Sequence, residues 1–360
     1  MMSPNPPSRP LSIGLVFETF ETYPVRPGDP VDAHVEYEPI ETVELLEAAV
    51  ATQGHRSKRL GSPQFVLAAA AGGGLKGIDA VWNIAEGQGS RNREAWAPSL
   101  LEMAGVPCLG SDGLSLSLSL DKAWANAWAA AAGLPVAPHC SLASAEGLSD
   151  RVLPADFPLF VKPRWEGTSK GIRSSSRVED RAGLALEVAR IVEDYAQPAL
   201  VEAFLPGAEY TVTVAGHAPP RALPVLQRAL ETSSRIGLHA LEGPEQGAAS
   251  GTLPYCLPGD LDADLEARLQ ALALEAFAAF ECLDFARVDF RLDAAGEPFF
   301  LEINPLPTFA PSGSFGIIAE LEGRPPERLL AEVLGAALIR LGLQDDPFPS
   351  SSTPVVPAEG

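Results

Sequence analysis

Residues 287–304 read RVDFRLDAAGEPFFLEIN, two short apolar runs on either side of the turn sequence DAAGE. Side chains alternate between the two faces of a strand, so Glu302 and Asn304 share one face of the second run. A turn at the centre of the stretch folds the two runs antiparallel. The pattern predicts a hairpin that brings Asp289 to within about one residue of the position opposite Glu302.

Two carboxylates placed so close together need a partner. At a separation of roughly 4 Å and an effective dielectric of about 20, they repel by about 4 kcal/mol, so the pair must share a proton or bind a cation. Oxygen atoms from Asp289, Glu302 and the Asn304 amide suit Mg²⁺, or Mn²⁺ in its place, which fills its remaining positions with water and substrate phosphates. The alternative interpretation is a solvated polar face on an edge hairpin.

A loop suited to binding phosphate follows the apolar strand sequence LFVKP. The loop, Glu166–Gly171, reads EGTSKG and offers backbone N–H groups, two hydroxyls and an ammonium group. The chain has only five lysines, and two of them, Lys162 and Lys170, lie here. Burial of Lys162 in an apolar strand is costly unless an anion accompanies it. An anionic ligand is therefore implied, although the loop by itself is equally compatible with a plain turn.

Composition and charge exclude several classes of partner. With 360 residues, of which 46% are hydrophobic and 20% charged, the chain is long enough for two or three domains and too apolar for general disorder. Its formal charge of −21 repels nucleic acid and anionic lipid, so a phosphate ligand needs locally concentrated cations or a divalent metal. The polar N-terminus and the lack of a run of about 18 apolar residues argue against secretion and membrane spanning. We therefore expect a cytoplasmic protein without nucleic-acid or membrane partners.

Hydrophobic periodicity predicts an α/β chain. Up to about residue 110, the pattern predicts a helix at 41–53 and a parallel sheet with strands at 11–17, 65–70 and 80–84. Residues 113–120, GLSLSLSL, alternate with a period of two, which formally favours a strand, and a helix is expected at 121–132. Beyond this point we expect strands at 159–163, 199–204, 210–215, 287–292 and 298–303, and helices at 181–195, 261–280 and 326–340.

Seven motifs follow one another in a recognisable order: NIAEG (83–87), LGSD (109–112), LDKAWAN (120–126), PLFVKPRWEGTSKGI (158–172), LVEAFLPGAEYTV (200–212), ARVDFRLD (286–293) and FLEINPLP (300–307). Together they resemble the ATP-grasp superfamily, specifically D-alanine–D-alanine ligases and their relatives, over roughly residues 11–340. The resemblance implies an ATP-grasp fold, α/β with α+β lobes, and an N-terminal parallel α/β domain. The implied division is a disordered N-terminus (1–10), an N-terminal substrate domain (11–115), a central ATP-grasp lobe (116–203), a C-terminal lobe with the metal site (204–345) and a disordered tail (346–360).

The resemblance also implies a reaction that uses ATP and Mg²⁺. One carboxylate attacks the γ-phosphate to give an acyl phosphate and ADP, and an amine then attacks the acyl carbon to form a peptide or amide bond. The implied partners are small amino-acid-like substrates, and a homodimer is a further expectation. Chemistry of this kind depends mainly on positioning, on neutralising charge and on excluding water.

The resemblance assigns site residues by position. Phosphate contacts fall on Lys122, Lys162 and the loop residues Glu166, Gly167, Thr168, Ser169 and Lys170. Adenine and ribose recognition fall on Glu202, on the backbone of Ala203 and Leu205, and on Glu209. The metal ligands are Asp289, Glu302 and Asn304. Arg287 matches the arginine that stabilises the oxyanion of the tetrahedral intermediate.

The segments expected to bind the amino acids depart from the family pattern. Glu18 is the candidate for holding the first amino group, and Ser314, or Ser312 beside it, is the candidate for binding a carboxylate. The family sequence H-G-x-x-G-E-D-G is replaced by EGQGSRNRE at 86–94, and the closing-loop lysine is missing from 239–251, where His239 is a candidate substitute.

These departures leave the substrates open. Synthesis of D-alanyl-D-alanine is the family default, and an amide ligase of specialised metabolism with non-alanine substrates is an alternative. A second alternative is a regulatory homologue that binds nucleotide without catalysis. The retention of charged residues expected to be buried, such as Lys162 and Arg287, argues against that second alternative.

Overall fold

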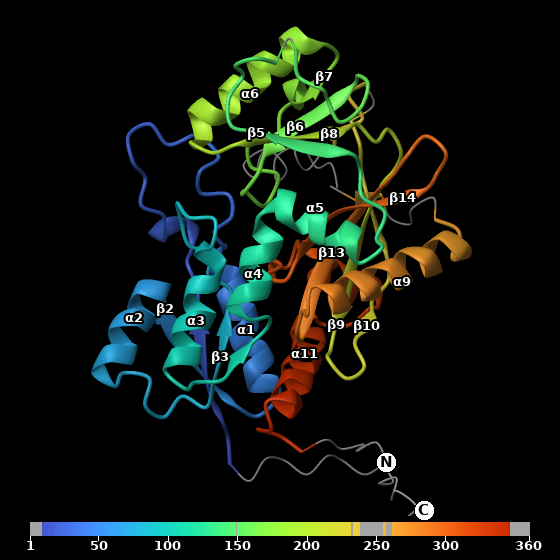
Figure 1. The fold of residues 1–360 in the computed structure, drawn as a ribbon. Helices are drawn as coiled ribbons and strands as arrows, with labels where there is room; N and C mark the ends of the chain where they lie inside the picture. Colours follow the sequence, from blue (N-terminus) through green and yellow to red (C-terminus); the bar gives the residue numbers. More distant parts are fainter. Residues whose placement is uncertain (1–8, 149, 232, 238–254, 257–260, 346–360) are drawn as a thin grey trace, which may run out of the picture.

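The computed structural model describes residues 9–148, 150–231, 233–237, 255–256 and 261–345. Figure 1 shows these residues arranged around three β-sheets, one in each of three successive parts of the chain. Parallel and antiparallel sheets occur together with many helices, which confirms the predicted α/β class. Residues 1–8 of the predicted N-terminal tail (1–10), the predicted tail at 346–360 and the segment 239–251 with His239 lie outside the described residues.

The N-terminal sheet is parallel and has the strand order β2-β1-β3-β4. Its strands are β1 (Ser12–Val16), β2 (Arg56–Gly61), β3 (Ala80–Asn83) and β4 (Cys108–Leu109), and its helices are α1 (Ile40–Thr52), α2 (Pro63–Gly72) and α3 (Trp96–Met103). The central strand β1 is apolar because both of its faces are covered by helices. Short 3₁₀ turns flank this unit at Phe20–Thr22 and Arg93–Ala95.

The prediction of a strand at 65–70 is wrong, because these residues form helix α2. Pro63 stands at its first turn, and Gly73 ends it with φ of +73°, a left-handed conformation that favours glycine. The true edge strand, β2, was not predicted because its sequence RSKRLG is largely polar and exposed. An edge strand faces water along one side and therefore carries little hydrophobic signal.

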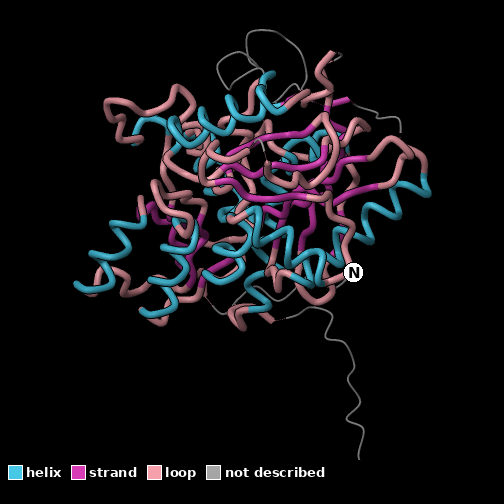
Figure 2. Tube along the Cα trace, turned by 45° about the horizontal axis from the view of Figure 1, so that its top comes forward, coloured by secondary structure: helices cyan, strands magenta, loops and turns pink. Residues whose placement is uncertain are grey.

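The central sheet is antiparallel, with the order β5-β8-β6-β7. Its strands are β5 (His139–Leu142), β6 (Leu159–Pro163), β7 (Arg177–Val178) and β8 (Ala199–Ala203). Helix α6 (Arg181–Tyr195) covers one face, as Figure 2 shows from an oblique view, and a 3₁₀ turn lies at Ser174–Ser176. Because α6 covers only one face of the central sheet, the side chains on its other face need not be apolar.

Two helices, α4 (Gly113–Leu120) and α5 (Lys122–Ala131), lead into the central sheet. The strand favoured at 113–120 is wrong, because Asp112 caps a helix there by accepting hydrogen bonds from the N–H groups of Leu114 and Ser115. An alternating apolar pattern over eight residues also fits a short helix that is buried on part of its circumference. The helix expected at 121–132 is confirmed by α5.

The C-terminal sheet has the order β12-β11-β9-β13-β14, with β10 paired to β9. Its strands are β9 (Glu209–Ala215), β10 (Arg221–Ala222), β11 (Leu226–Arg228), β12 (Tyr255–Cys256), β13 (Phe285–Leu292) and β14 (Pro298–Asn304). Helix α9 (Ala263–Ala279) packs on one face, against alternate residues such as Val288 and Phe290. The predicted hairpin is confirmed, with Asp289 directly opposite Glu302 and a bulge immediately after this pair.

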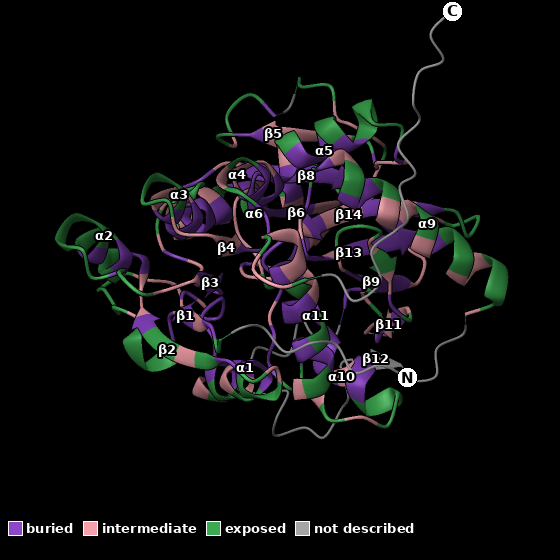
Figure 3. Ribbon diagram, turned by 90° about the horizontal axis from the view of Figure 1, so that it is seen from below, coloured by how far each residue is buried: buried purple, intermediate pink, exposed green. Residues whose placement is uncertain are grey.

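The last two helices, α10 (Ser314–Leu321) and α11 (Pro326–Arg340), return to the N-terminal part of the molecule. Figure 3 shows the buried side of α11 between α1 and the C-terminal sheet. Its apolar residues share one core with strand β1, helix α1, Phe285 and Phe309. Each of the three sheets falls within one of the three predicted domain ranges. Helix α11, from the predicted C-terminal lobe, packs against the N-terminal domain. The exact domain boundaries remain a prediction.

Candidate active site

The carboxylate hairpin presents its polar face away from helix α9. Strand alternation buries Val288 and Phe290 in the core and turns Arg287 and Asp289 to the other side. The guanidinium of Arg287 lies 3.0 Å from an oxygen of Asp289 and 3.6 Å from an oxygen of Glu302. Asn304 stands opposite Arg287 in the register. One arginine of the same sheet therefore lies close to both carboxylates and offsets part of their charge.

Two lysines from the central lobe lie close to Glu302. Lys122, at the start of α5, places its ammonium 3.1 Å from a Glu302 oxygen. Burial works to raise the pKa of Glu302, but the charges of Lys122, Lys162 and Arg287 outweigh it and lower that pKa to about 2. Glu302 is therefore ionised at neutral pH, and cations from three different elements surround it.

Lys162 is buried on the face of the central sheet opposite helix α6. Its neighbour Val161 packs into the core beneath that helix, so alternation along β6 turns Lys162 toward the C-terminal lobe. The Lys162 ammonium lies 2.7 Å from Glu202, which also accepts a 3.0 Å hydrogen bond from Asn126. Burial works to lower the pKa of Lys162, but Glu202 and Glu302 outweigh it and raise the pKa. The lysine therefore remains charged between two carboxylates.

The loop Glu166–Gly171, which we call the lid loop, lies directly beyond these lysines. Lys122 donates a 2.5 Å hydrogen bond to the carbonyl of Glu166. Thr168 and Ser169 both have positive φ angles, 47° and 58°. Successive residues in this region turn their N–H groups to one side of the chain, an arrangement that binds anions. Lys170 pairs with Glu166 at 2.8 Å and adds positive charge to the loop.

The candidates for adenine and ribose recognition run from the end of β8 to the start of β9. The N–H of Ala203 donates to the carbonyl of Pro138 at 2.9 Å, and the carbonyl of Leu205 accepts a 2.6 Å hydrogen bond from Arg291. Glu209 pairs with the same arginine at 3.0 Å. Arg291 thus ties the end of this segment to strand β13. The nucleotide-binding roles of these residues remain a prediction.

The two amino-acid-site candidates lie apart from this group in the described contacts. Glu18 is buried and accepts a 2.8 Å hydrogen bond from the N–H of Gly87. Burial raises its pKa in spite of that bond and of a further one from the Tyr37 hydroxyl. Ser314 is buried at the first turn of α10. Neither described environment places the residue against Arg287, so both roles remain predictions.

A small cavity of about 220 Å³ lies between the N-terminal lobe and the lid loop. Tyr23, Tyr37 and Gln88 line it on one side, and Glu166 and Lys170 line it on the other. Beneath this region, burial and the neighbouring Glu36 carboxylate raise the pKa of Glu94 to about 7, against the charge of Arg93. The N-terminal lobe therefore holds several buried carboxylates next to this cavity.

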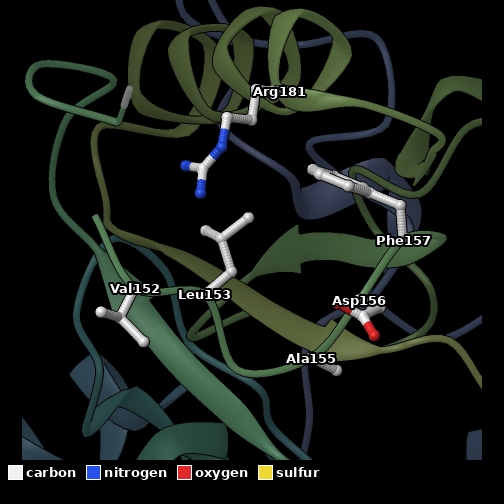
Figure 4. Close-up of a pocket in the computed structure, with 6 residues that line it drawn as sticks. All are labelled: Val152, Leu153, Ala155, Asp156, Phe157 and Arg181. Atoms are coloured by element: carbon white, nitrogen blue, oxygen red, sulfur yellow. The ribbon is translucent and has the colours of Figure 1, made fainter. Parts of the chain in front are cut away.

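A hollow of about 460 Å³ lies elsewhere, on the central lobe, and Figure 4 shows Arg181 pointing into it. The guanidinium of Arg181 is held by the carbonyls of Leu148 and Arg151. The lining residues, which include Leu153 and Phe157, contain none of the site candidates. This hollow takes no part in the site.

Several residues of the site were not singled out from the sequence. Asp121 binds Arg164 through two hydrogen bonds, of 2.6 and 2.8 Å, and caps α5 at Trp124. Its position just before a helix is a capping signal that could have identified it. Asn126 lies one helical turn after Lys122, so the spacing of four residues predicts a shared face. Glu36 gives no such signal, because its partners are distant in sequence.

The donor set of the hairpin fits a hard divalent cation. Asp289 also accepts a 2.8 Å hydrogen bond from Thr211, which orients its carboxylate. No three His, Cys, Asp or Glu side chains form a metal-binding group within the part of the chain that is described. Two carboxylates and one amide make a partial set, which suits Mg²⁺ because this ion takes its other ligands from phosphates and water. No helix in the described ranges has the length and apolarity needed to cross a bilayer.

Comparisons with known proteins agree with this geometry. The family model described as D-ala D-ala ligase C-terminus matches residues 128–335, more than half of the chain. Similar proteins include D-alanine–D-alanine ligases of Halorhodospira halophila (33% identity, covering 74% of this chain and 81% of that protein) and Pelotomaculum thermopropionicum (30%, 68% and 76%). The uncharacterised protein y4sG of Sinorhizobium fredii is 32% identical over 71% of this chain and 74% of its own length.

The fold agrees with a solved structure as well. The crystal structure of D-alanine–D-alanine ligase from Bacillus anthracis complexed with ATP superposes with a TM-score of 0.66, at 20% identity, covering 92% of this chain and 98% of the other. At this identity, the likeness bears on the fold, which is therefore ATP-grasp, as predicted. The family match and the two ligase relatives carry the assignment further: the chain belongs to the D-alanine–D-alanine ligase family of ATP-grasp enzymes.

Proposed function

We propose that the protein joins the carboxyl group of one amino acid to the amine of another at the expense of ATP. The observation that carries the proposal is the convergence of Lys122, Lys162, Arg287 and Glu302, which come from two lobes to one place. The chain is strongly acidic overall, yet three of its cations lie around this one carboxylate. Such concentration suits a triphosphate, whose charge the rest of the molecule would repel.

The roles of the chain's own residues follow from their charges. Lys122 and Lys162 would neutralise the phosphates of ATP, and the N–H groups of Thr168 and Ser169 would bind them from the lid side. Asp289, Glu302 and Asn304 would hold Mg²⁺, which when bound supplies charge neutralisation between phosphates. The acid's carboxylate oxygen bonds to the γ-phosphorus as ADP leaves, giving an acyl phosphate.

The second step makes the amide. The amine nitrogen attacks the acyl carbon, a proton leaves the nitrogen, and phosphate departs from the tetrahedral intermediate. Arg287 would donate hydrogen bonds to the oxyanion formed in this step, a contribution of about 3 kcal/mol for one well-placed donor. Glu18, with its charge buried and its oxygen held by the Gly87 N–H, is proposed to bind the ammonium group of the first amino acid.

We propose D-alanine as the first substrate to test, because similar proteins carry the name D-alanine–D-alanine ligase. The replaced segment 86–94 supports a wider screen of acids and amines. A cytoplasmic location and a homodimer remain part of the proposal. Neither is needed for the chemistry described.

The test is a mass-spectrometric screen of the purified protein with ATP, Mg²⁺ and a library of amino acids. We expect ADP and a new amide product that depend on one acid and one amine. The variant Glu302→Gln should lose metal-dependent turnover, and normal activity of this variant at low Mg²⁺ would contradict the metal assignment. Nucleotide binding without turnover across the whole library would favour the non-catalytic homologue.

A further inference from the structure

Two carboxylates of the N-terminal lobe bind the lid loop. The N–H of Gly167 donates a 2.6 Å hydrogen bond to Glu36, and the ammonium of Lys170 lies 3.3 Å from the same carboxylate. The N–H of Gly171 donates a 2.8 Å hydrogen bond to Asp32. Both ends of the lid loop are therefore attached to the N-terminal segment.

Each of these carboxylates is itself held in place. Glu36 accepts a 2.5 Å hydrogen bond from Arg93, and both side chains are almost fully buried, at 5% and 4% exposure. Arg93 also donates to the carbonyl of Trp165, next to the lid loop, at 2.9 Å. Asp32 accepts from the Tyr195 hydroxyl at 2.9 Å. The lid loop is thus attached through Glu36, which Arg93 holds, and through Asp32, which Tyr195 of the central lobe holds.

The lid loop needs such external support. Thr168 is β-branched, and its φ of 47° lies in a region that such residues rarely occupy. Ser169 follows with φ of 58°. Conformations of this kind cost of the order of 1–3 kcal/mol each and persist only where the surrounding structure imposes them. Bonds at Gly167 and Gly171, on either side of the strained pair, supply that restraint.

We propose that Asp32 and Glu36 are positioning residues that hold the lid loop closed over the nucleotide site. This inference rests on the proposed function for its effect on catalysis, but the attachment itself does not depend on it. By fixing the lid loop before ATP arrives, the two carboxylates keep the N–H groups of Thr168 and Ser169 in position for phosphate. They also keep water from the acyl phosphate.

The first experiment measures the attachment without nucleotide, by amide hydrogen exchange on the full chain. Asp32→Ala and Glu36→Ala should each speed exchange of the amides of 166–171 at least tenfold, and Glu36→Gln, which keeps an acceptor oxygen, should restore part of the protection. Glu44→Gln, an exposed site on α1, is the matched control and should exchange like the wild type. Unchanged exchange in Asp32→Ala overturns the proposal, even if Glu36→Ala fails to fold.

The second experiment separates positioning from competition. This experiment needs a wild-type protein that forms the amide product. Compared with that protein, Asp32→Ala should have a KM for ATP about tenfold higher and should hydrolyse a larger share of ATP without forming amide product. If Glu36 instead competes with phosphate for the Gly167 N–H, Glu36→Gln lowers the KM for ATP, which overturns the proposal. Lost protection in a protein without any turnover refutes the proposed function and leaves the attachment standing.

Discussion

Arg287 joins two carboxylates that would otherwise repel each other, and it is also the group expected to stabilise the oxyanion. Its removal should affect the chemical step far more than the binding of ATP. We expect Arg287→Ala to lower kcat by roughly 10²- to 10³-fold, with little change in the dissociation constant for ATP. Steady-state kinetics and equilibrium nucleotide binding measure the two effects. The exposed Arg268, which pairs with Glu297, gives the control Arg268→Ala. An unchanged kcat in Arg287→Ala would contradict the assigned role.

Glu94 should make the folded protein less stable as the pH rises toward neutrality. The pKa of Glu94 is about 4.5 in the unfolded chain and about 7 in the folded protein. The protonated group therefore contributes fully to the free energy of unfolding below pH 4.5, and this contribution is lost as the pH rises to about 7. The loss is of the order of a few kcal/mol, at 1.36 kcal/mol per pKa unit. Glu94→Gln removes this dependence. Tm measured from pH 5 to pH 8 should therefore fall more steeply for the wild type, and parallel curves would refute the assignment.

Single residues differ in how far the sequence reveals them. The pairing of Asp289 with Glu302 could be predicted because alternation and one short turn determine it locally. The cost of burying Lys162 without an anion likewise predicts a charged partner, here Glu202. The contact between Glu36 and Gly167 could not be predicted, because the two residues are 131 positions apart and no periodic pattern links them.

At the scale of elements, helix α4 shows why an alternating pattern misleads. Asp112 decides the structure by accepting hydrogen bonds from two N–H groups at the first turn. Asp112→Ala should lower the free energy of unfolding by about 1 kcal/mol, as is usual for a lost cap. Chemical denaturation measures this free energy. The control Ser117→Ala, inside the same helix, should change it by less than about 0.5 kcal/mol. Equal effects of the two substitutions would show that the cap does not matter.

Elements with a clear helical repeat or a buried apolar run were predicted closely, among them α6, α11 and the β13–β14 hairpin. The polar edge strand β2 was not, because its pairing with β1 depends on the neighbouring strand and on little in its own sequence. Helix α2 was mistaken for a strand because the six apolar residues at 65–70 fit either structure.

At the scale of the whole molecule, α11 joins the end of the chain to its beginning. Leu334 is fully buried in the core that this helix shares with β1 and α1. Leu334→Ala should destabilise the protein by about 2–5 kcal/mol. Because the core spans both ends of the chain, we expect one cooperative unfolding transition at a lower Tm. Leu321→Ala, at a position 53% exposed on α10, is the control. Separate unfolding of the N-terminal lobe in the wild type would contradict a shared core.

The central claim is that the clustered cations and carboxylates activate an acid by transferring phosphate to its carboxylate. The most direct measurement supplies D-alanine labelled with ¹⁸O in both carboxyl oxygens, together with ATP and Mg²⁺, and analyses the released phosphate by mass spectrometry. An acyl phosphate carries one oxygen of the acid into the phosphate, so we predict one ¹⁸O atom per phosphate. Amide product accompanied by unlabelled phosphate would contradict the account.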